Sequence, residues 1–144
     1  MGALAFVTTA HGRNVEEAFN NAAEKARWDH GHSGYTGTIA EKPSAIHFPL
    51  PVNYTRDQIE ALPAVLENWW AASATNDYVH STDEERTKAR AEMQELRAQY
   101  PGLNLTRLAA QWADKWEAAV AFRLPRETGQ LEPDEWLFCG LASS

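Results

Sequence analysis

The sequence has 144 residues, 44% of them hydrophobic and 23% charged, which fits one globular domain with its own apolar core. Asp and Glu number 20 against 13 Lys and Arg, and the formal net charge of −7 argues against a protein that binds nucleic-acid backbones. No run approaches the ~20 apolar residues of a membrane-spanning helix, and the single cysteine, Cys139, cannot form an internal disulfide. We therefore expect a cytoplasmic protein with no membrane partner and one domain over residues 1–144.

The first elements along the chain are a strand and a helix. Residues 3–9, "ALAFVTT", are short and partly β-branched, which favours a strand. Asn14 and Glu17 have the spacing of a capping box, and apolar residues then recur at helical spacing. The helix should end near His30, where Gly31 can take a left-handed conformation.

A hairpin is the next expected element. Residues 35–41 form one predicted strand, "KPS" makes the turn, and residues 45–50 return as the second strand. Gly37 within the first strand is costly unless a bulge or a close neighbour requires it.

Three helices are expected in the middle of the chain. Two begin at capping boxes, Thr55 with Gln58 and Thr82 with Glu85, and Pro63 should kink or restart the first of them. A third helix is predicted over residues 104–116.

The chain ends in a second predicted hairpin, "AAVAFRLP" and "EWLFCGLA", joined by a polar loop. The element order is therefore β-α-β-β-α-α-α-β-β. We expect an α+β fold with a mainly antiparallel sheet of about five strands and helices packed on one face.

Six tryptophans are unusual for this length. Trp69 and Trp70 are neighbours on a predicted helix and point about 100° apart, so one core face cannot bury both completely. We expect this pair to contact a protein partner or a second copy of the chain, because Trp is enriched at binding hot spots. The other four are expected to share the core: Trp28, Trp112, Trp116 and Trp136.

The stretch "WDHGHSGYTGTIAEK" is the main candidate site. Two imidazoles follow a helix C-terminus, hydroxyls come next, and glycines allow main-chain N–H groups to approach an anion closely. These features predict a site for a small anionic ligand, with no metal and no cofactor indicated. Its residues are His30, His32, Tyr35, Thr36, Thr38, Glu41 and Lys42. The alternative is a tight structural turn that binds nothing.

The chain also resembles a group of small proteins encoded by bacteriophages, prophages and plasmids. The resemblance lies in the helix "AFNNAAEKARWDHGH" followed by "GYTGTIAEK", and in "DKWEAAVAF" and "WLFCGLASS" near the end. The group has no established activity, so the resemblance implies a mobile-element context and not a reaction. Proteins from such contexts often modulate host machinery or host defence.

These observations lead to one leading function and two alternatives. The leading function is a non-enzymatic accessory protein that binds a nucleotide-like anion or a host protein, and that also self-associates. The first alternative is a small enzyme acting on a nucleotide, with His30 or His32 as general acid or base and Glu41 as its partner. The second is a purely structural or assembly protein.

Overall fold

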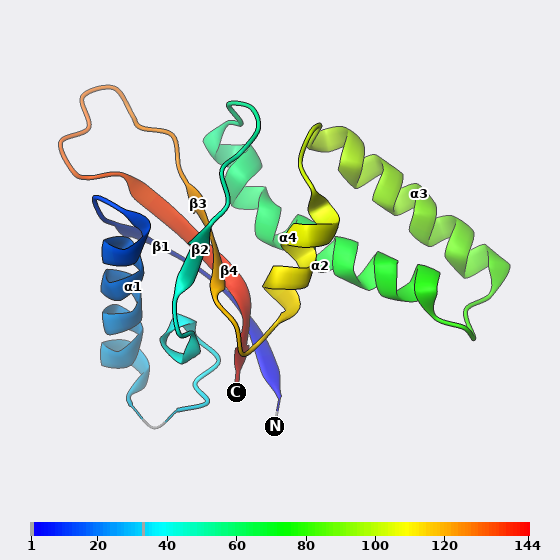
Figure 1. Cartoon of the computed structure of the whole chain (residues 1–144), viewed down its shortest axis with the longest axis horizontal. Coiled ribbons are helices and arrows are strands. Elements are labelled where there is room, and N and C mark those ends of the chain that lie inside the picture. Colours follow the sequence, from blue (N-terminus) through cyan, green and yellow to red (C-terminus); the bar gives the residue numbers. More distant parts are fainter. Residues whose placement is uncertain (1, 33) are drawn as a thin grey trace.

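The computed structural model describes residues 2–32 and 34–144, and one sheet organises them (Figure 1). The sheet of the described residues has four strands in the order β1-β4-β3-β2. The β1–β4 and β4–β3 pairs are antiparallel, whereas β2 and β3 are parallel. The α+β class is confirmed, but the sheet has four strands where about five were expected, and its parallel β2–β3 pair makes it mixed. The strands are β1 (Ala3–His11), β2 (Ala45–His47), β3 (Ala119–Arg123) and β4 (Glu135–Ser143).

The helices begin where the sequence predicts. Thr55 and Thr82 form reciprocal capping boxes with Gln58 and Glu85. Asn14 accepts a hydrogen bond from the Glu17 N–H, but the Glu17 carboxylate turns to Arg13, so this cap lacks its reciprocal bond. The helices are α1 (Val15–His30), α2 (Arg56–Asp77), α3 (Asp83–Gln99) and α4 (Leu105–Ala113). The second helix contains Pro63 but does not restart there.

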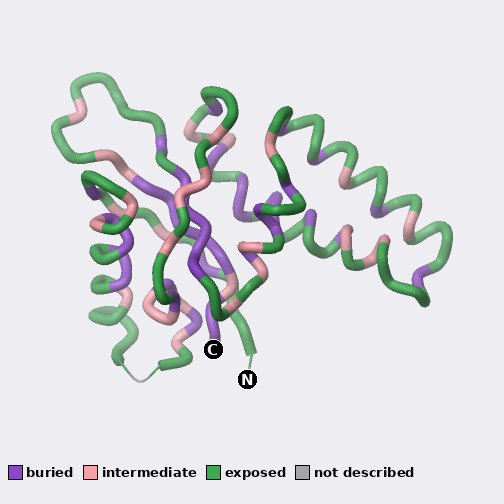
Figure 2. The backbone as a smooth tube through the Cα atoms, in the orientation of Figure 1, coloured by how far each residue is buried: buried purple, intermediate pink, exposed green. Residues whose placement is uncertain are grey.

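Helices cover both faces of the sheet, so the expectation of helices on one face is wrong (Figure 1). In β3, Ala119 and Ala121 pack toward α1, whereas Val120 and Phe122 pack toward α2 and α4. The physical reason lies in the central strands, which are apolar on both sides and need cover on both. Figure 2 shows this burial concentrated along the middle of the sheet.

The predicted strand over residues 35–41 does not form. Gly34, Tyr35 and Gly37 all have positive φ, which an extended strand does not contain. Thr38 instead caps a short 3-10 helix, η1 (Ile39–Glu41). The Gly37 N–H donates to Ser143 O at 2.9 Å, and its Cα lies against Leu4. The bend therefore lies against the end of the β1–β4 pair and adds no strand.

The tryptophans divide between core and surface. Trp112 and Trp136 are buried as expected, but Trp116 is half exposed and Trp28 is 88% exposed, so these two expectations are wrong. Trp28 lies five residues beyond the buried Ala23 on α1, which turns it about 140° away from the core.

Cys139 lies in the middle of β4 and is fully buried. Burial raises the pKa of the Cys139 thiol to about 12. None of the helices in the described residues is both long and apolar enough to cross a membrane.

Candidate functional site

Three polar side chains of the glycine-rich bend (residues 31–42) are linked to one another by hydrogen bonds: Thr36, Thr38 and Glu41. The Glu41 carboxylate accepts hydrogen bonds from Thr36 N at 3.2 Å and Thr36 Oγ1 at 2.6 Å, and Thr36 Oγ1 lies 2.8 Å from Thr38 Oγ1. Partial burial raises the pKa of Glu41, but these bonds and one from Tyr35 N–H outweigh it, so the pKa lies below its usual value. The carboxylate is therefore a structural acceptor that holds the bend closed.

Lys42 points away from these groups. Its side chain is only 4% exposed, and Nζ donates to the main-chain oxygen of Asp114 at 2.7 Å, just after α4. Burial lowers the pKa of Lys42, although the carboxylates of Asp114 and Glu117 act in the opposite direction. The amine thus satisfies a carbonyl at a helix C-terminus, where the helix dipole favours a cation.

The other residues predicted for the bend are divided between two places. His30 and Thr38 line a hollow of about 170 Å³ between α1 and β1, which Lys25 and Asp29 also line. His32 and Tyr35 are exposed. The structure therefore joins Thr36, Thr38 and Glu41 by hydrogen bonds, places His30 beside Thr38, and separates Lys42 from all of them.

Trp69 and Trp70 differ in solvent exposure, because neighbouring residues on a helix point about 100° apart. Trp69 is 2% exposed and lies in the core with Arg97 over its ring at 5.3 Å, so it cannot anchor a partner. Trp70 is 46% exposed and remains open to contact.

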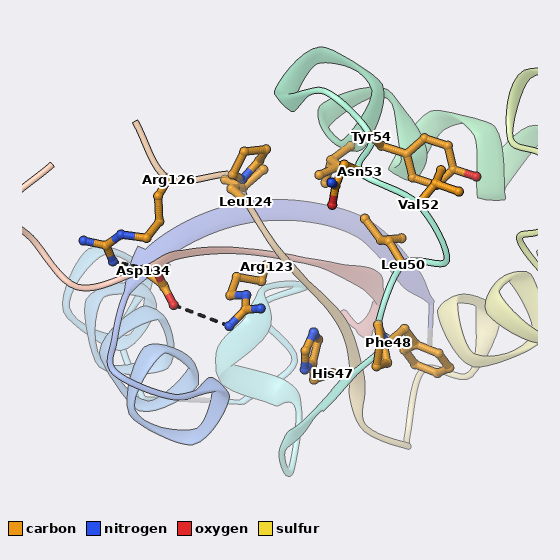
Figure 3. Close-up of a pocket in the computed structure, with 13 residues that line it drawn as sticks. His47, Phe48, Leu50, Val52, Asn53, Tyr54, Arg123, Leu124, Arg126 and Asp134 are labelled. Carbon is orange, nitrogen blue, oxygen red and sulfur yellow. Dashed lines mark hydrogen bonds and ion pairs between the residues drawn. The ribbon is translucent and has the colours of Figure 1, made fainter. Parts of the chain in front are cut away.

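A larger hollow lies where the two parallel strands end, and we call it the strand-end cleft (Figure 3). After His47 the chain leaves β2 toward α2, whereas after Arg123 it enters the loop that returns to β4. The two paths diverge and leave a space of about 480 Å³. Carboxyl ends of neighbouring strands with diverging connections are frequent ligand sites in sheets with parallel strands.

The cleft carries positive charge. Arg126 Nη1 contacts Asp134 Oδ1 at 2.7 Å, and its other amino group donates to two carbonyls of its own loop, Gln130 and Glu132. Arg123 has a longer contact, 3.7 Å from Nη1 to Asp134 Oδ2. Two guanidinium groups therefore face one carboxylate, and within the described residues this long ion pair is the only polar contact that the Arg123 side chain makes.

His47 lies at the floor of the strand-end cleft. Its ring packs edge-on against Trp136, with 4.9 Å between the centroids. Burial, and then the charge of Arg123, lowers the pKa of His47. The imidazole is thus neutral at pH 7 and can donate or accept a hydrogen bond.

The remaining wall of the cleft is apolar and aromatic. Phe48, Leu50 and Tyr54 lie along it (Figure 3). The Tyr54 hydroxyl donates to Pro101 O at 2.7 Å, so the cleft receives the ring and not the polar tip. The wall ends at Tyr54, which immediately precedes Thr55, the N-cap residue of α2. A 2.7 Å ion pair between Arg56 Nη1 and Glu135 Oε1 holds this end of α2 beside β4.

Comparison with known proteins gives no relative: no protein-family model, curated protein or solved structure matches the chain. Within residues 2–32 and 34–144, no group of three or more His, Cys, Asp or Glu side chains could hold a metal ion.

Sequence reasoning missed His47, Arg123 and Arg126. One signal was present, because "AFRLPRE" places a basic residue at the end of an apolar strand and a proline soon after it. The decisive fact is the parallel pairing of β2 with β3, which brings residues 47 and 123 to the same end of the sheet.

Proposed function

We propose that the protein is a non-enzymatic binding protein for a small anionic ligand of nucleotide size, held in the strand-end cleft. The observation that carries the proposal is the Arg123 guanidinium, which lies beside an apolar wall with one long ion pair as its partner. A guanidinium with free donors matches the geometry of phosphate and carboxylate groups and binds them in a bidentate manner.

The cleft suits a ligand with one charged end and one planar or apolar end. Its volume lies within the range of small-molecule sites, about 300–1,000 Å³. The anionic group would bind Arg123, the neutral imidazole of His47 would donate a hydrogen bond, and the planar part would pack on Phe48 and Leu50. This division between a polar end and an apolar wall supports a nucleotide-like ligand.

In the enzyme alternative, His30 or His32 loses the carboxylate partner that was assigned to it. The Glu41 carboxylate is engaged by Thr36, and no hydrogen bond among the described residues joins it to His30 or His32. We therefore favour binding without turnover. The resemblance to phage and plasmid proteins adds the proposal that such binding modulates a host process.

A thermal-shift and calorimetric titration tests the proposal. Inorganic phosphate, pyrophosphate, AMP, ATP and a cyclic mononucleotide would each be added to the wild type, to Arg123→Ala and to Arg90→Ala. The Arg90→Ala control removes the same charge from an exposed site on α3. A ligand at a hundred times its dissociation constant adds about 2.7 kcal/mol to the free energy of unfolding.

We expect stabilisation of the wild type and of Arg90→Ala, and its loss in Arg123→Ala. Millimolar anions that stabilise none of the three proteins, or that stabilise Arg123→Ala fully, would overturn the proposal.

A further inference from the structure

The edge of the sheet at β1 is unusually open. Its register with β4 runs without a break from Ala3 opposite Ser143 to His11 opposite Glu135. Natural edge strands normally carry a charge, a proline, a bulge or a very short length, which prevents pairing with another chain. The opposite edge, β2, has only three residues and is soon followed by Pro49. Residues 3–10, "ALAFVTTA", contain neither a charged residue nor a proline.

The alternation of hydrogen bonds along β1 shows which of its main-chain N–H and C=O groups face away from β4. Gly2 and Ser144 exchange both main-chain hydrogen bonds, and Gly12 N donates to Asp134 O. Bonded and non-bonded pairs alternate along an antiparallel ladder, so the even-numbered residues of β1 bond β4. The main-chain groups of Ala5, Val7 and Thr9 therefore point away from the sheet.

We propose that this edge pairs with β1 of a second copy of the chain, antiparallel about a twofold axis near Val7. The axis would place Val7 opposite the second copy's Val7 and Ala5 opposite its Thr9. The two four-stranded sheets would become one continuous sheet. Val7, 56% exposed, and the equally exposed Leu4 would then lose solvent contact.

Charge complementarity favours a second copy as the occupant. Lys25 and Asp29 form a 3.0 Å ion pair on α1 and line the small hollow beside Val7 and Thr8. The segment of α1 between these two charges thus lies next to the point where the axis would pass. A twofold rotation there reverses the direction of α1, so Lys25 of each copy faces Asp29 of the other. At this pair of positions opposite charges would therefore face each other across the axis, despite the net charge of −7.

Sedimentation velocity and light scattering over a range of concentrations test the pairing. The wild type should show a concentration-dependent dimer. Val7→Lys would place two ammonium groups side by side at the axis and should raise the dissociation constant of the dimer by about tenfold or more. Ile46→Lys, an equivalent change at a half-exposed β-branched residue of the other edge, should leave the dimer intact.

A charge reversal on α1 provides a second test that leaves the sheet untouched. Lys25→Glu should weaken the dimer, and the double variant with Asp29→Lys should restore it, because the reversed pair is again complementary. Circular dichroism checks that each variant is folded.

A wild type that stays monomeric at all concentrations would overturn the proposal. A dimer that survives both Val7→Lys and Lys25→Glu would also overturn it. Dissociation by Trp70→Ala with no effect of Val7→Lys would move the interface to α2.

Discussion

The glycine-rich bend and the strand-end cleft both gather polar side chains, yet their polar groups are used differently. In the bend, Thr36, Thr38 and Glu41 bond one another within six residues of chain. In the cleft, Arg123 and His47 come from distant parts of the chain, and the Arg123 guanidinium has one long ion pair. A cluster of polar residues close in sequence can satisfy itself. Groups brought together by the fold keep the capacity to bind a ligand.

The largest effect expected in this comparison is the loss of stability in Gly37→Ala. Its Cβ would lie 2.6 Å from Leu4 Cδ1, and φ is +71°, so the variant combines overpacking with left-handed strain. We expect the free energy of unfolding to fall by roughly 2–4 kcal/mol. Urea denaturation measures this change. The control Gly129→Ala has φ +78° but no neighbour within 4 Å, so it should lose only about 1–2 kcal/mol. Equal losses in the two variants would contradict a packed bend.

The next effect is on ligand affinity at the cleft. Arg123→Ala should weaken anion binding by about 1.5–3 kcal/mol, the range of hydrogen bonds to charged groups. Arg123→Lys keeps the charge but loses the planar bidentate geometry. Its affinity for the anion should therefore lie between those of the wild type and Arg123→Ala. Calorimetry with the strongest-binding anion from the screen measures both. An Arg123→Lys variant as weak as Arg123→Ala would mean that charge alone contributes little there.

Glu41→Gln tests whether the bend and the cleft have separate roles, and its expected effect on stability is smaller. An amide cannot accept as well as the carboxylate from Thr36 N and Oγ1, so stability at neutral pH should fall by about 1 kcal/mol. Anion affinity should not change if the ligand binds in the cleft. Reduced affinity in a folded Glu41→Gln protein would instead return the ligand site to the bend.

The pH dependence of Glu41 follows from its lowered pKa. The unfolded chain takes up a proton at higher pH than the folded protein does, so this stabilisation is present above the unfolded pKa, near 4.3. It is lost as pH falls through the folded pKa. Glu41→Gln should lose that part of the acid sensitivity, which denaturation at several acidic pH values measures.

His47 gives the smallest expected effect, a change in pH dependence. Its pKa is lowered on folding, so its contribution to stability is present above the unfolded pKa, near 6.5, and is lost as pH falls through the folded value. A bound anion favours the protonated ring, so anion affinity should rise on acidification. His47→Asn should abolish both trends. If its pH profile of affinity matches that of the wild type, His47 does not contact the anion.

Features set by neighbouring residues were predictable. The caps at Thr55 and Thr82, the end of α1 at His30 and the terminal β3–β4 hairpin all depend on short sequence patterns, and all are confirmed. Gly31 has a positive φ of 85°, but its ψ of −178° lies outside the predicted left-handed helical conformation. Residues 35–41 were wrongly predicted as a strand because the "KPS" turn and the apolar stretch after it indicated a hairpin. The positive φ values at Gly34 and Gly37 decide otherwise.

Features set by distant residues were not predictable in the same way. The parallel pairing of β2 with β3 joins segments more than 70 residues apart, so the cleft between them left no local pattern. Lys42 was assigned to the bend because of its place in the sequence, but its amine satisfies Asp114 O, which lies 72 residues away. One clue to the two-sided sheet was present, since "WLFCGLA" is a continuous apolar run and not an alternating one.

The buried thiol of Cys139 is a natural probe of local opening at the central strand β4. It is the sole thiol in the chain, it has no solvent access, and its pKa lies far above neutral pH. An alkylating reagent can modify it only while β4 is transiently separated from its neighbours. The labelling rate therefore reports how readily the native protein opens at β4. A ligand or a second copy that stabilises the sheet would lower this rate, and no engineered probe is needed.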